Sequence, residues 1–273
     1  MPAHSDTKTV AVVTGCSSGI GQGLAEVLAA RGLTVLATAR KVKSLAHLTK
    51  KHDNIIALPL ELGDLDSLTS FRDARTGGRV DVLINNAGTH YAATAADLEI
   101  AEAEKLFTIN VFAVMRLCQL FLPMLRESAK EGRGGRIVQI GSVTRDVPVV
   151  WQSVYNASKA ALSQYTNTLR LEVKPFGVSV TEVITGYVQS NILHHGLVDT
   201  ERMTYEGNRT GMPSRLYAES VVDKILRPEP SSEIWEGKLA WVLGFLVNFC
   251  PSWFSRWVFY RSFKLDKLKA LRP

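Results

Sequence analysis

A glycine-rich turn at residues 14–21 is the feature that most restricts how this chain can fold. The apolar run 9–13 precedes the turn TGCSSGIG, and Leu24, Val27 and Leu28 follow it at helical spacing. Glycines allow a tight bend and a close backbone approach, while the first N–H groups of the helix point outward beyond the turn. The sequence therefore predicts a pyrophosphate site at the start of the helix, and an ordinary glycine turn is the alternative.

Further apolar runs alternate with helical patterns along the chain. The remaining predicted strands cover residues 33–38, 55–60, 80–84, 136–140, 178–184 and 234–238. This alternation favours a parallel, doubly wound α/β sheet with helices on both faces, and right-handed crossovers place the carboxyl ends of all strands along one edge. We therefore expect the glycine turn, Asn86, Ser142 and Gly186 to line one crevice. One or two helices are expected over 97–125, followed by a solvated linker over 127–135.

Tyr155 and Lys159 lie four residues apart, so on a helix they project from one face, one turn apart. A phenol has a pKa near ~10 and exchanges its proton poorly at neutral pH. An ammonium one turn away favours the phenolate and is expected to lower this pKa, which makes Tyr155 a candidate general acid or base. Ser142 follows the strand at 136–140 and is placed to reach the same reacting atom. An ordinary surface pair on an amphipathic helix is the alternative.

The second predicted strand ends at Ala39-Arg40-Lys41, without the carboxylate that usually holds the ribose 2′-hydroxyl of NAD. A carboxylate would repel a 2′-phosphate, whereas Arg40 can bind it through two hydrogen bonds. The sequence therefore favours NADPH over NADH. In the alternative interpretation, Arg40 and Lys41 are simply the solvated start of a helix.

Composition limits the possible classes of protein. A length of 273 residues with 46% hydrophobic and 21% charged residues suits one large globular α/β domain. The three cysteines, Cys16, Cys118 and Cys250, match no metal-binding pattern and indicate reduced thiols in a protein that faces the cytosol. The net charge of +6 suits an anionic substrate, a membrane surface or nucleic acid, but no aromatic–basic motif supports nucleic acid.

Taken together, these motifs resemble the short-chain dehydrogenase/reductase family over roughly residues 9 to 192. The resemblance rests on TGCSSGIG (14–21), NNAG (85–88), Asn110, Ser142 and YNASK (155–159). It implies a single Rossmann-type domain with a twisted seven-stranded sheet, and a nicotinamide cofactor held by the glycine turn.

The resemblance also implies roles for individual residues. Tyr155 is the implied proton donor in ketone reduction, and Lys159 lowers its pKa and hydrogen-bonds the nicotinamide ribose. Ser142 stabilises the carbonyl oxygen, and Asn110 helps to hold a water that connects Lys159 to solvent. The implied cofactor-binding residues are Gly15, Ser17, Ser18, Gly19, Ile20, Gly21, Arg40, Glu61, Leu62, Asn86, Ala87, Gly88, Tyr155, Lys159, Gly186, Val188 and Ser190.

Two positions depart from the family pattern. Glu61 stands where the family usually has an aspartate near the adenine, so the charge is kept with a longer side chain. Thr185 stands where proline is common, and we expect it to loosen the turn before Gly186. Gly186 itself keeps the close approach to the nicotinamide that the resemblance implies.

The C-terminal part of the chain is unusually apolar. We expect a catalytic domain over 1–238, in which 191–233 covers the substrate, and an apolar and basic extension over 239–273. The apolar run before Pro251 is shorter than the ~20 residues of a spanning helix. Tryptophans beside arginines and lysines suit a membrane interface, so we expect peripheral or monotopic membrane contact through 239–264. The alternatives for this segment are a hairpin that inserts into the membrane, a dimer surface and a lid over an apolar substrate pocket.

A closer resemblance covers ATARK (37–41) and this tail. It is to the fungal NADPH-dependent 1-acyldihydroxyacetone-phosphate reductases, which reside on lipid droplets and endoplasmic reticulum. The resemblance implies an NADPH-dependent carbonyl reductase for a lipophilic ketone, such as an acylated dihydroxyacetone phosphate, on one of these membranes. A soluble cytoplasmic enzyme is the alternative location. Two alternative functions are left open. One is a reductase or dehydrogenase that acts on a fungal secondary metabolite, a sterol or a retinoid, and the other is an NADPH-binding scaffold without turnover. A homodimer is also left open.

Overall fold

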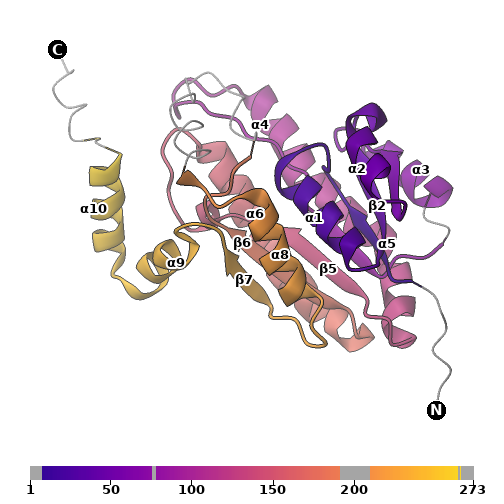
Figure 1. The fold of residues 1–273 in the computed structure, drawn as a ribbon. Coiled ribbons are helices and arrows are strands. Elements are labelled where there is room, and N and C mark those ends of the chain that lie inside the picture. The colour runs from indigo at the N-terminus through magenta and orange to yellow at the C-terminus, as the bar shows by residue number, and fades with distance from the viewer. Residues whose placement is uncertain (1–7, 76–77, 191–209, 264, 266–273) are drawn as a thin grey trace.

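The computed structural model describes residues 8–75, 78–190, 210–263 and 265. A seven-stranded sheet lies at its centre, with every neighbouring pair of strands parallel, in the order β3-β2-β1-β4-β5-β6-β7 (Figure 1). The strands are β1 Val10–Val13, β2 Thr34–Ala39, β3 Ile55–Pro59, β4 Val82–Asn85, β5 Arg136–Ile140, β6 Ser179–Thr185 and β7 Glu233–Glu236. The predicted doubly wound α/β fold is confirmed, with strand ends displaced by one or two residues.

Helices cover both faces of the sheet because alternate strand side chains point to opposite sides. The helices are α1 Gly19–Ala30, α2 Ala46–Lys51, α3 Leu65–Arg75, α4 Ile100–Phe107, α5 Ala113–Lys130, α6 Ser153–Val173, α8 Ser214–Ile225, α9 Ala240–Phe249 and α10 Ser252–Ser262. Val13 of β1 belongs to the core beneath α1 and α8, which lie side by side in Figure 1. Val12 points to the other core, beneath α3, α5 and α6.

Short helical turns complete the connections, and several of them carry residues that the sequence singled out. They are η1 Val42–Leu45, η2 Thr108–Phe112, η3 Val143–Arg145 and η4 Lys174–Phe176. The turn η2 is a π-helical turn between α4 and α5, and η3 directly follows Ser142.

The expected linker over 127–135 is wrong in its first half, because α5 continues to Lys130. Phe121, Leu125 and Ser128 are buried at helical spacing along α5. The Ser128 hydroxyl donates a 2.7 Å hydrogen bond to the buried carboxylate of Asp81, which draws the last turn of the helix against the sheet. The polar residues at the end of this helix led to the prediction of a linker, although one of them, Ser128, faces the interior.

The continuous helical run Ile100–Lys130 is long and apolar enough to cross a membrane by length and composition. Half of its most apolar stretch is buried inside the protein, and Leu117 and Phe121 belong to the core against the sheet. This run is therefore accounted for as a core helix of the fold.

The predicted substrate-covering segment, 191–233, lies partly outside the described residues, because the structure describes it only from residue 210 onward. Its described part contains α8, whose Tyr217 and Val221 are fully buried in the core beneath α1. The division between a catalytic domain ending at 238 and an extension beginning at 239 stays a prediction.

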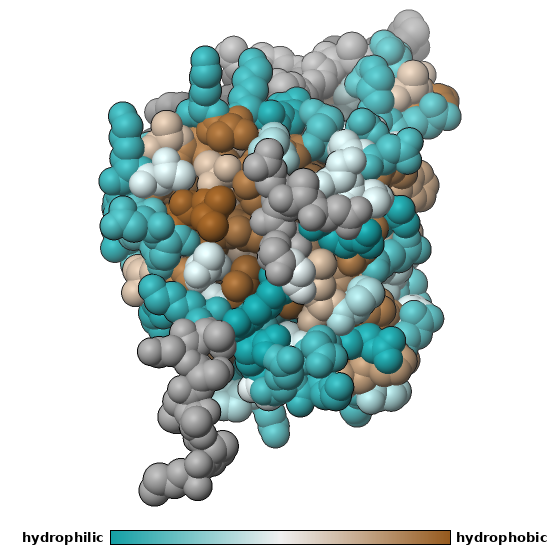
Figure 2. Space-filling view, turned by 90° about the vertical axis from the view of Figure 1, so that its right-hand side faces the viewer, coloured by the Kyte–Doolittle hydropathy of each residue, from teal (hydrophilic) through white to brown (hydrophobic). Residues whose placement is uncertain are grey.

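Different elements lie at the two ends of the sheet. On the side that carries α2 and α3, hydrophilic side chains surround a limited apolar area (Figure 2). Ile56, on the edge strand β3, is 47% exposed there. At the opposite end, α9 and α10 follow β7 and lie beyond the sheet (Figure 1).

Candidate active site

The turn between β1 and α1 fits a diphosphate group closely. Gly15 and Gly19 have positive φ angles of 73° and 60°, which residues with a side chain rarely adopt. A Cβ on Gly21 would lie 2.2 Å from the carbonyl oxygen of Gly15. Ser17 and Ser18 are exposed, and Ser18, the N-cap of α1, makes no side-chain capping bond. The uncapped N–H groups at this helix start therefore suit the negative charge of a pyrophosphate.

Asn86, which follows β4, holds this turn in place. Its Nδ2 donates to the carbonyl oxygens of Thr14 at 2.7 Å and Gly15 at 3.3 Å. In return, the backbone N–H groups of Asn86 and Ala87 both donate to the Thr14 hydroxyl at 2.9 Å. Sequence reasoning did not assign Thr14 this role, although it begins the glycine motif. A threonine at the end of a strand gives no local sign that two N–H groups from a strand about seventy residues away will share its oxygen.

Asn110 lies in the π-helical turn η2 and is 2% exposed. Its Oδ1 accepts a 2.8 Å hydrogen bond from the N–H of Thr89, and its Nδ2 donates to the Thr89 carbonyl at 2.9 Å. The same Nδ2 donates to Ser158 Oγ at 3.2 Å, and Ser158 donates to the carbonyl of Tyr155 at 2.8 Å. Asn110 thus joins the loop after β4 to the helix that carries Tyr155. Its predicted role in holding a water stays a prediction.

Ser142, Tyr155 and Lys159 meet where β5 ends and α6 begins. Ser142 Oγ accepts hydrogen bonds from the N–H of Thr144 at 3.2 Å and from the Thr144 hydroxyl at 3.0 Å. Both bonds use the oxygen of Ser142, so its own proton remains available for donation to a substrate. Lys159 Nζ lies 5.7 Å from the centre of the Tyr155 ring and donates to the carbonyl of Ile140 at 3.0 Å. Two further N–H groups of the ammonium remain for a ribose.

The Tyr155 pKa is raised, so the lowering expected from Lys159 is wrong. Burial raises the pKa of Tyr155 to about 12, and a hydrogen bond with Ser142 opposes this only in part. Burial also lowers the pKa of Lys159 to about 8, while the charge of Glu182 acts to raise it. Removal from water penalises the charged form of each group, so here it outweighs their spacing on the helix.

The residues expected around the adenosine end of the cofactor differ in exposure and in their hydrogen-bond partners. Arg40 is exposed beyond β2, and its side chain makes no hydrogen bond or ion pair with the described residues. Glu61 Oε1 instead accepts a 3.1 Å hydrogen bond from the N–H of Gly63, so its carboxylate is turned back toward its own loop. Leu62 is 6% exposed and belongs to the core, which leaves its backbone as the part that faces a ligand.

Thr185 does not loosen the end of β6, contrary to expectation. Its Oγ1 lies 2.7 Å from the hydroxyl of Tyr217, a fully buried residue of α8, and the two share a hydrogen bond. Only glycine fits at position 186, for a reason that the sequence did not reveal. A Cβ added to Gly186 would lie 2.5 Å from the Lys238 carbonyl oxygen and 3.0 Å from Ala240 N. The chain that leaves β7 therefore passes directly over this glycine.

Val188 and Ser190 continue from this turn toward the glycine motif. Val188 forms an isolated β-bridge with Met212, and a Cβ on Gly19 would lie 3.4 Å from that of Ser190. The loops after β1 and β6 thus converge, as predicted for strand ends on one edge of a parallel sheet.

His90 was not singled out from the sequence. It is 2% exposed, and the centre of its ring lies 5.0 Å from that of Tyr155 at an interplanar angle of 60°. Its position two residues after Gly88 offers the only sequence signal, and that signal does not reveal a contact with a helix more than sixty residues away.

Comparisons with known proteins agree with this arrangement. A family profile for the short chain dehydrogenases matches residues 9–199. The short-chain dehydrogenase fogD of Aspergillus ruber is 37% identical over 282 residues, covering 95% of this chain and 94% of the relative. The NADPH-dependent 1-acyldihydroxyacetone phosphate reductase of Saccharomyces cerevisiae is 32% identical over 285 residues, covering 97% and 94%. A metagenomic short-chain oxidoreductase solved in complex with NADP has a TM-score of 0.67 at 26% identity, covering 84% of this chain and 97% of the other.

Proposed function

Since this chain belongs to the short-chain dehydrogenase family, we propose that it is an NADPH-dependent carbonyl reductase for a lipophilic ketone. The observation that most supports this is the meeting of Ser142, Tyr155 and Lys159 at the sheet edge that also carries the glycine turn. A scaffold that only senses NADPH could use Lys159 to bind the ribose, but it needs no proton donor at Tyr155 and no hydroxyl at Ser142. The absence of a carboxylate at the end of β2, together with the exposed Arg40, favours NADPH as the cofactor.

The mechanism follows from the positions of the donors. Bound NADPH supplies the hydride that reduces the carbonyl carbon of the substrate. Negative charge then grows on the carbonyl oxygen, where the hydroxyls of Ser142 and Tyr155 both donate hydrogen bonds that strengthen toward the transition state. Tyr155 transfers its proton to this oxygen, and the ammonium of Lys159 stabilises the phenolate that remains. The high pKa of Tyr155, about 12, keeps the phenol protonated and ready to donate.

The surroundings of Ser142 support a lipophilic substrate. Val143 and Val147, just after Ser142, form one apolar cluster with Ala240 and Phe259 of the C-terminal helices. The apolar C-terminal helices therefore begin beside the catalytic turn. An acylated dihydroxyacetone phosphate has the required ketone, an apolar chain and an anionic group that suits the net charge of +6. The S. cerevisiae relative bears the name of such a reductase.

The outer side of α9 and α10 supports contact with a lipid surface. We name this set the aromatic face; it consists of Trp241, Phe245, Phe249, Trp253 and Trp257, which are 56–77% exposed. Residues 239–273 contain six lysines and arginines and one aspartate, so charge complementarity favours anionic lipid headgroups over a neutral partner. Contact through the aromatic face would hold the turn after Ser142, whose Val143 and Val147 pack against these helices, near the membrane of a lipid droplet or the endoplasmic reticulum.

Replacing the five residues of the aromatic face by serine is expected to abolish binding to vesicles of phosphatidylcholine and phosphatidic acid. Each large apolar side chain contributes ~1.5–3 kcal/mol when buried, so losing five should lower partitioning by more than ~100-fold. Flotation of purified protein with vesicles measures this. Truncation at 239 is a poorer test, because it also removes the buried Ala240 and Phe259.

A control variant, Ile56→Ser with Leu171→Ser, removes exposed apolar side chains from β3 and α6 and should float like wild type. Equal flotation of the aromatic-face variant and wild type would contradict membrane binding. A second result would also contradict membrane binding. If wild type formed a dimer without lipid and the same serine substitutions converted it to monomers, the aromatic face would bind a second copy of the chain.

The reductase function is tested by NADPH oxidation with a panel of ketones that includes 1-acyldihydroxyacetone phosphate and a short water-soluble ketone. We expect turnover that increases with the length of the acyl chain. If no ketone causes NADPH oxidation while NADPH still binds, the scaffold alternative is correct.

A further inference from the structure

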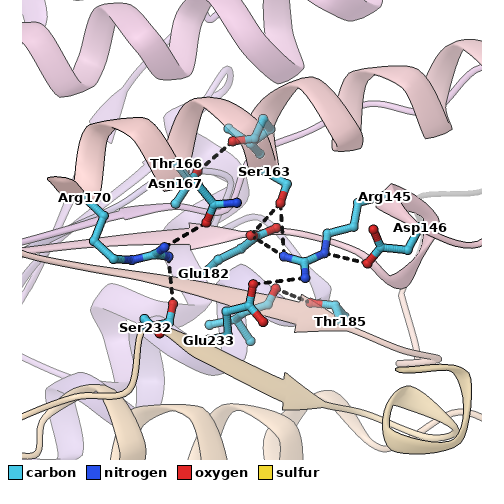
Figure 3. A network of polar contacts seen from close by, with 12 residues as sticks. Arg145, Asp146, Ser163, Thr166, Asn167, Arg170, Glu182, Thr185, Ser232 and Glu233 are labelled. Atoms are coloured by element: carbon cyan, nitrogen blue, oxygen red, sulfur yellow. Dashed lines mark hydrogen bonds and ion pairs between the residues drawn. The ribbon is translucent and has the colours of Figure 1, made fainter. Parts of the chain in front are cut away.

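A network of charged and polar side chains joins the turn η3 to α6, β6 and β7 (Figure 3). Its centre is Arg145, three residues after Ser142 in the turn η3. Arg145 Nη1 donates to Glu182 Oε2 at 2.6 Å and to Ser163 Oγ at 3.0 Å, and Ser163 itself donates to the same carboxylate oxygen at 2.9 Å. Glu182 belongs to β6 and Ser163 to α6, so the network joins the catalytic turn to two further elements of the site.

The remaining contacts of Arg145 fix its orientation. Its Nε donates to Asp146 at 2.8 Å, and its Nη2 lies 3.0 Å from a carboxylate oxygen of Glu233 on β7. The guanidinium carbon also lies 5.4 Å from the centre of the Trp235 ring. A planar group with three anionic partners and an aromatic neighbour has little freedom to move.

Glu182 is fully buried, yet only one of its oxygens is satisfied. Oε1 has no hydrogen-bond partner among the described residues. A Cβ on Gly141 would lie 2.5 Å from this oxygen, so Oε1 contacts the backbone between Ile140, which accepts the bond from Lys159, and Ser142. A buried carboxylate oxygen without a hydrogen-bond partner lowers the stability of the folded protein. A purely structural role in packing therefore does not explain why a glutamate occupies this position.

The chain holds a second buried carboxylate that serves as a comparison. Asp81, at the amino-terminal edge of the sheet, is also fully buried, but both of its oxygens are hydrogen-bonded. Oδ1 accepts from Ser128 at 2.7 Å and Arg133 at 3.0 Å, and Oδ2 accepts from the N–H of Val10 at 2.7 Å. Asp81 ties elements together without facing any group of the active site.

We propose that Glu182, held by Arg145, is a positioning residue that fixes the turn of Ser142 and places a negative charge where it keeps Lys159 protonated. The catalytic part of this inference rests on the proposed carbonyl reductase function. The charged and titratable groups around Glu182 are Arg145 from η3, Lys159 and Arg170 from α6, and Glu233 from β7, while Asp146, the residue after η3, contacts Arg145.

Directions of the pKa shifts agree with this geometry. Burial lowers the pKa of Lys159 to about 8, and the charge of Glu182 is the influence that opposes the fall. Burial raises the pKa of Glu182 itself, while the charge of Arg145 and the hydrogen bond from Ser163 favour its ionised form. Removing Glu182 would therefore take away the negative charge that offsets the cost of burying the ammonium of Lys159.

The test is the titration of Lys159 in wild type and in Glu182→Gln, followed by NMR of labelled lysine side chains. The Lys159 signal is the one that disappears in Lys159→Arg. Glu182→Gln removes the charge that raises the Lys159 pKa, so the midpoint should fall by about one pH unit. In ketone reduction, the loss of kcat at high pH should begin at a correspondingly lower pH, because reduction needs the protonated pair Tyr155–Lys159.

Asp81→Asn is the matched control, since it neutralises a buried, arginine-paired carboxylate far from Lys159. It should lower the melting temperature about as much as Glu182→Gln and leave the Lys159 midpoint in place. Should Glu182→Gln fail to fold, the double variant Arg145→Gln/Glu182→Gln removes both charges of this ion pair, and its Lys159 midpoint should shift in the same direction by less.

An unchanged Lys159 midpoint in Glu182→Gln or in the double variant overturns the inference, whether or not the protein reduces ketones. A shift of the same size in Asp81→Asn also overturns it, because the effect would then come from general destabilisation. Failure of wild type to reduce any ketone is a different result, which rejects the reductase function and leaves the lysine titration as a separate test of Glu182.

Discussion

Tyr155→Phe is expected to lower kcat for ketone reduction by at least ~10²–10⁴-fold while NADPH still binds. The substitution removes one oxygen atom and keeps the ring, which contacts His90 at 5.0 Å between ring centres. It therefore removes both the proton and one of the two hydrogen bonds to the developing oxyanion. Lys159 still donates to Ile140 and remains available to a ribose, so affinity for NADPH should change little.

Steady-state kinetics together with NADPH fluorescence titration separate these two effects. Tyr165→Phe is the matched control, because Tyr165 lies on the same helix but contacts Cys118 in the core instead of Ser142. This variant should retain kcat within a few-fold. If Tyr155→Phe reduced ketones at the wild-type rate, Tyr155 would not be the proton donor.

Arg40→Asp is expected to reverse the choice of cofactor. Hydrogen bonds to a charged group are worth about 1.5–3 kcal/mol, which is about tenfold to hundredfold in affinity for NADPH. The new carboxylate adds repulsion of the 2′-phosphate and can accept a hydrogen bond from the 2′-hydroxyl of NADH. Together these effects should move the ratio of kcat/KM for NADPH over NADH by more than ~100-fold.

The measurement is kcat/KM for each cofactor with one ketone. Lys50→Asp makes the same change of charge at another exposed position, on α2, and should leave the ratio unaltered. An equal loss with both cofactors in Arg40→Asp would mean that Arg40 stabilises the loop and does not recognise the phosphate.

Much of the fold could be predicted because the information is local. Apolar runs and glycines mark strands and their ends, and the parallel topology then brings the loops after β1, β4, β5 and β6 to one edge. The prediction that the glycine turn, Asn86 and Ser142 share a crevice needed no knowledge of side-chain contacts. The contact between Asn86 and Thr14 confirms that the loops after β1 and β4 meet, and the place of Ser142 in the same crevice stays a prediction.

Contacts between distant segments could not be predicted in the same way. The pairing of Arg145 with Glu182 joins residues 37 positions apart, and nothing in the local pattern marks either as buried. The shift of the Tyr155 pKa to about 12 depends on how completely neighbouring elements exclude water, which the spacing of Tyr155 and Lys159 does not reveal. The hydrogen bond between Thr185 and Tyr217 likewise depends on α8 folding back under β6.

The π-helical turn η2 has a consequence for attempts to make this protein more heat-resistant. A π-turn contains one residue more than a regular helical turn, and such insertions are usually retained at a cost in stability. Deleting Ile109 would convert Ile100–Lys130 into a regular helix and is the kind of change that a screen for thermostability would select. It would also shift Asn110 by one position, about 100° around the helix axis, and so away from Thr89 and Ser158. Selection for stability alone would therefore tend to remove the connection between this helix and α6, the helix that carries Tyr155.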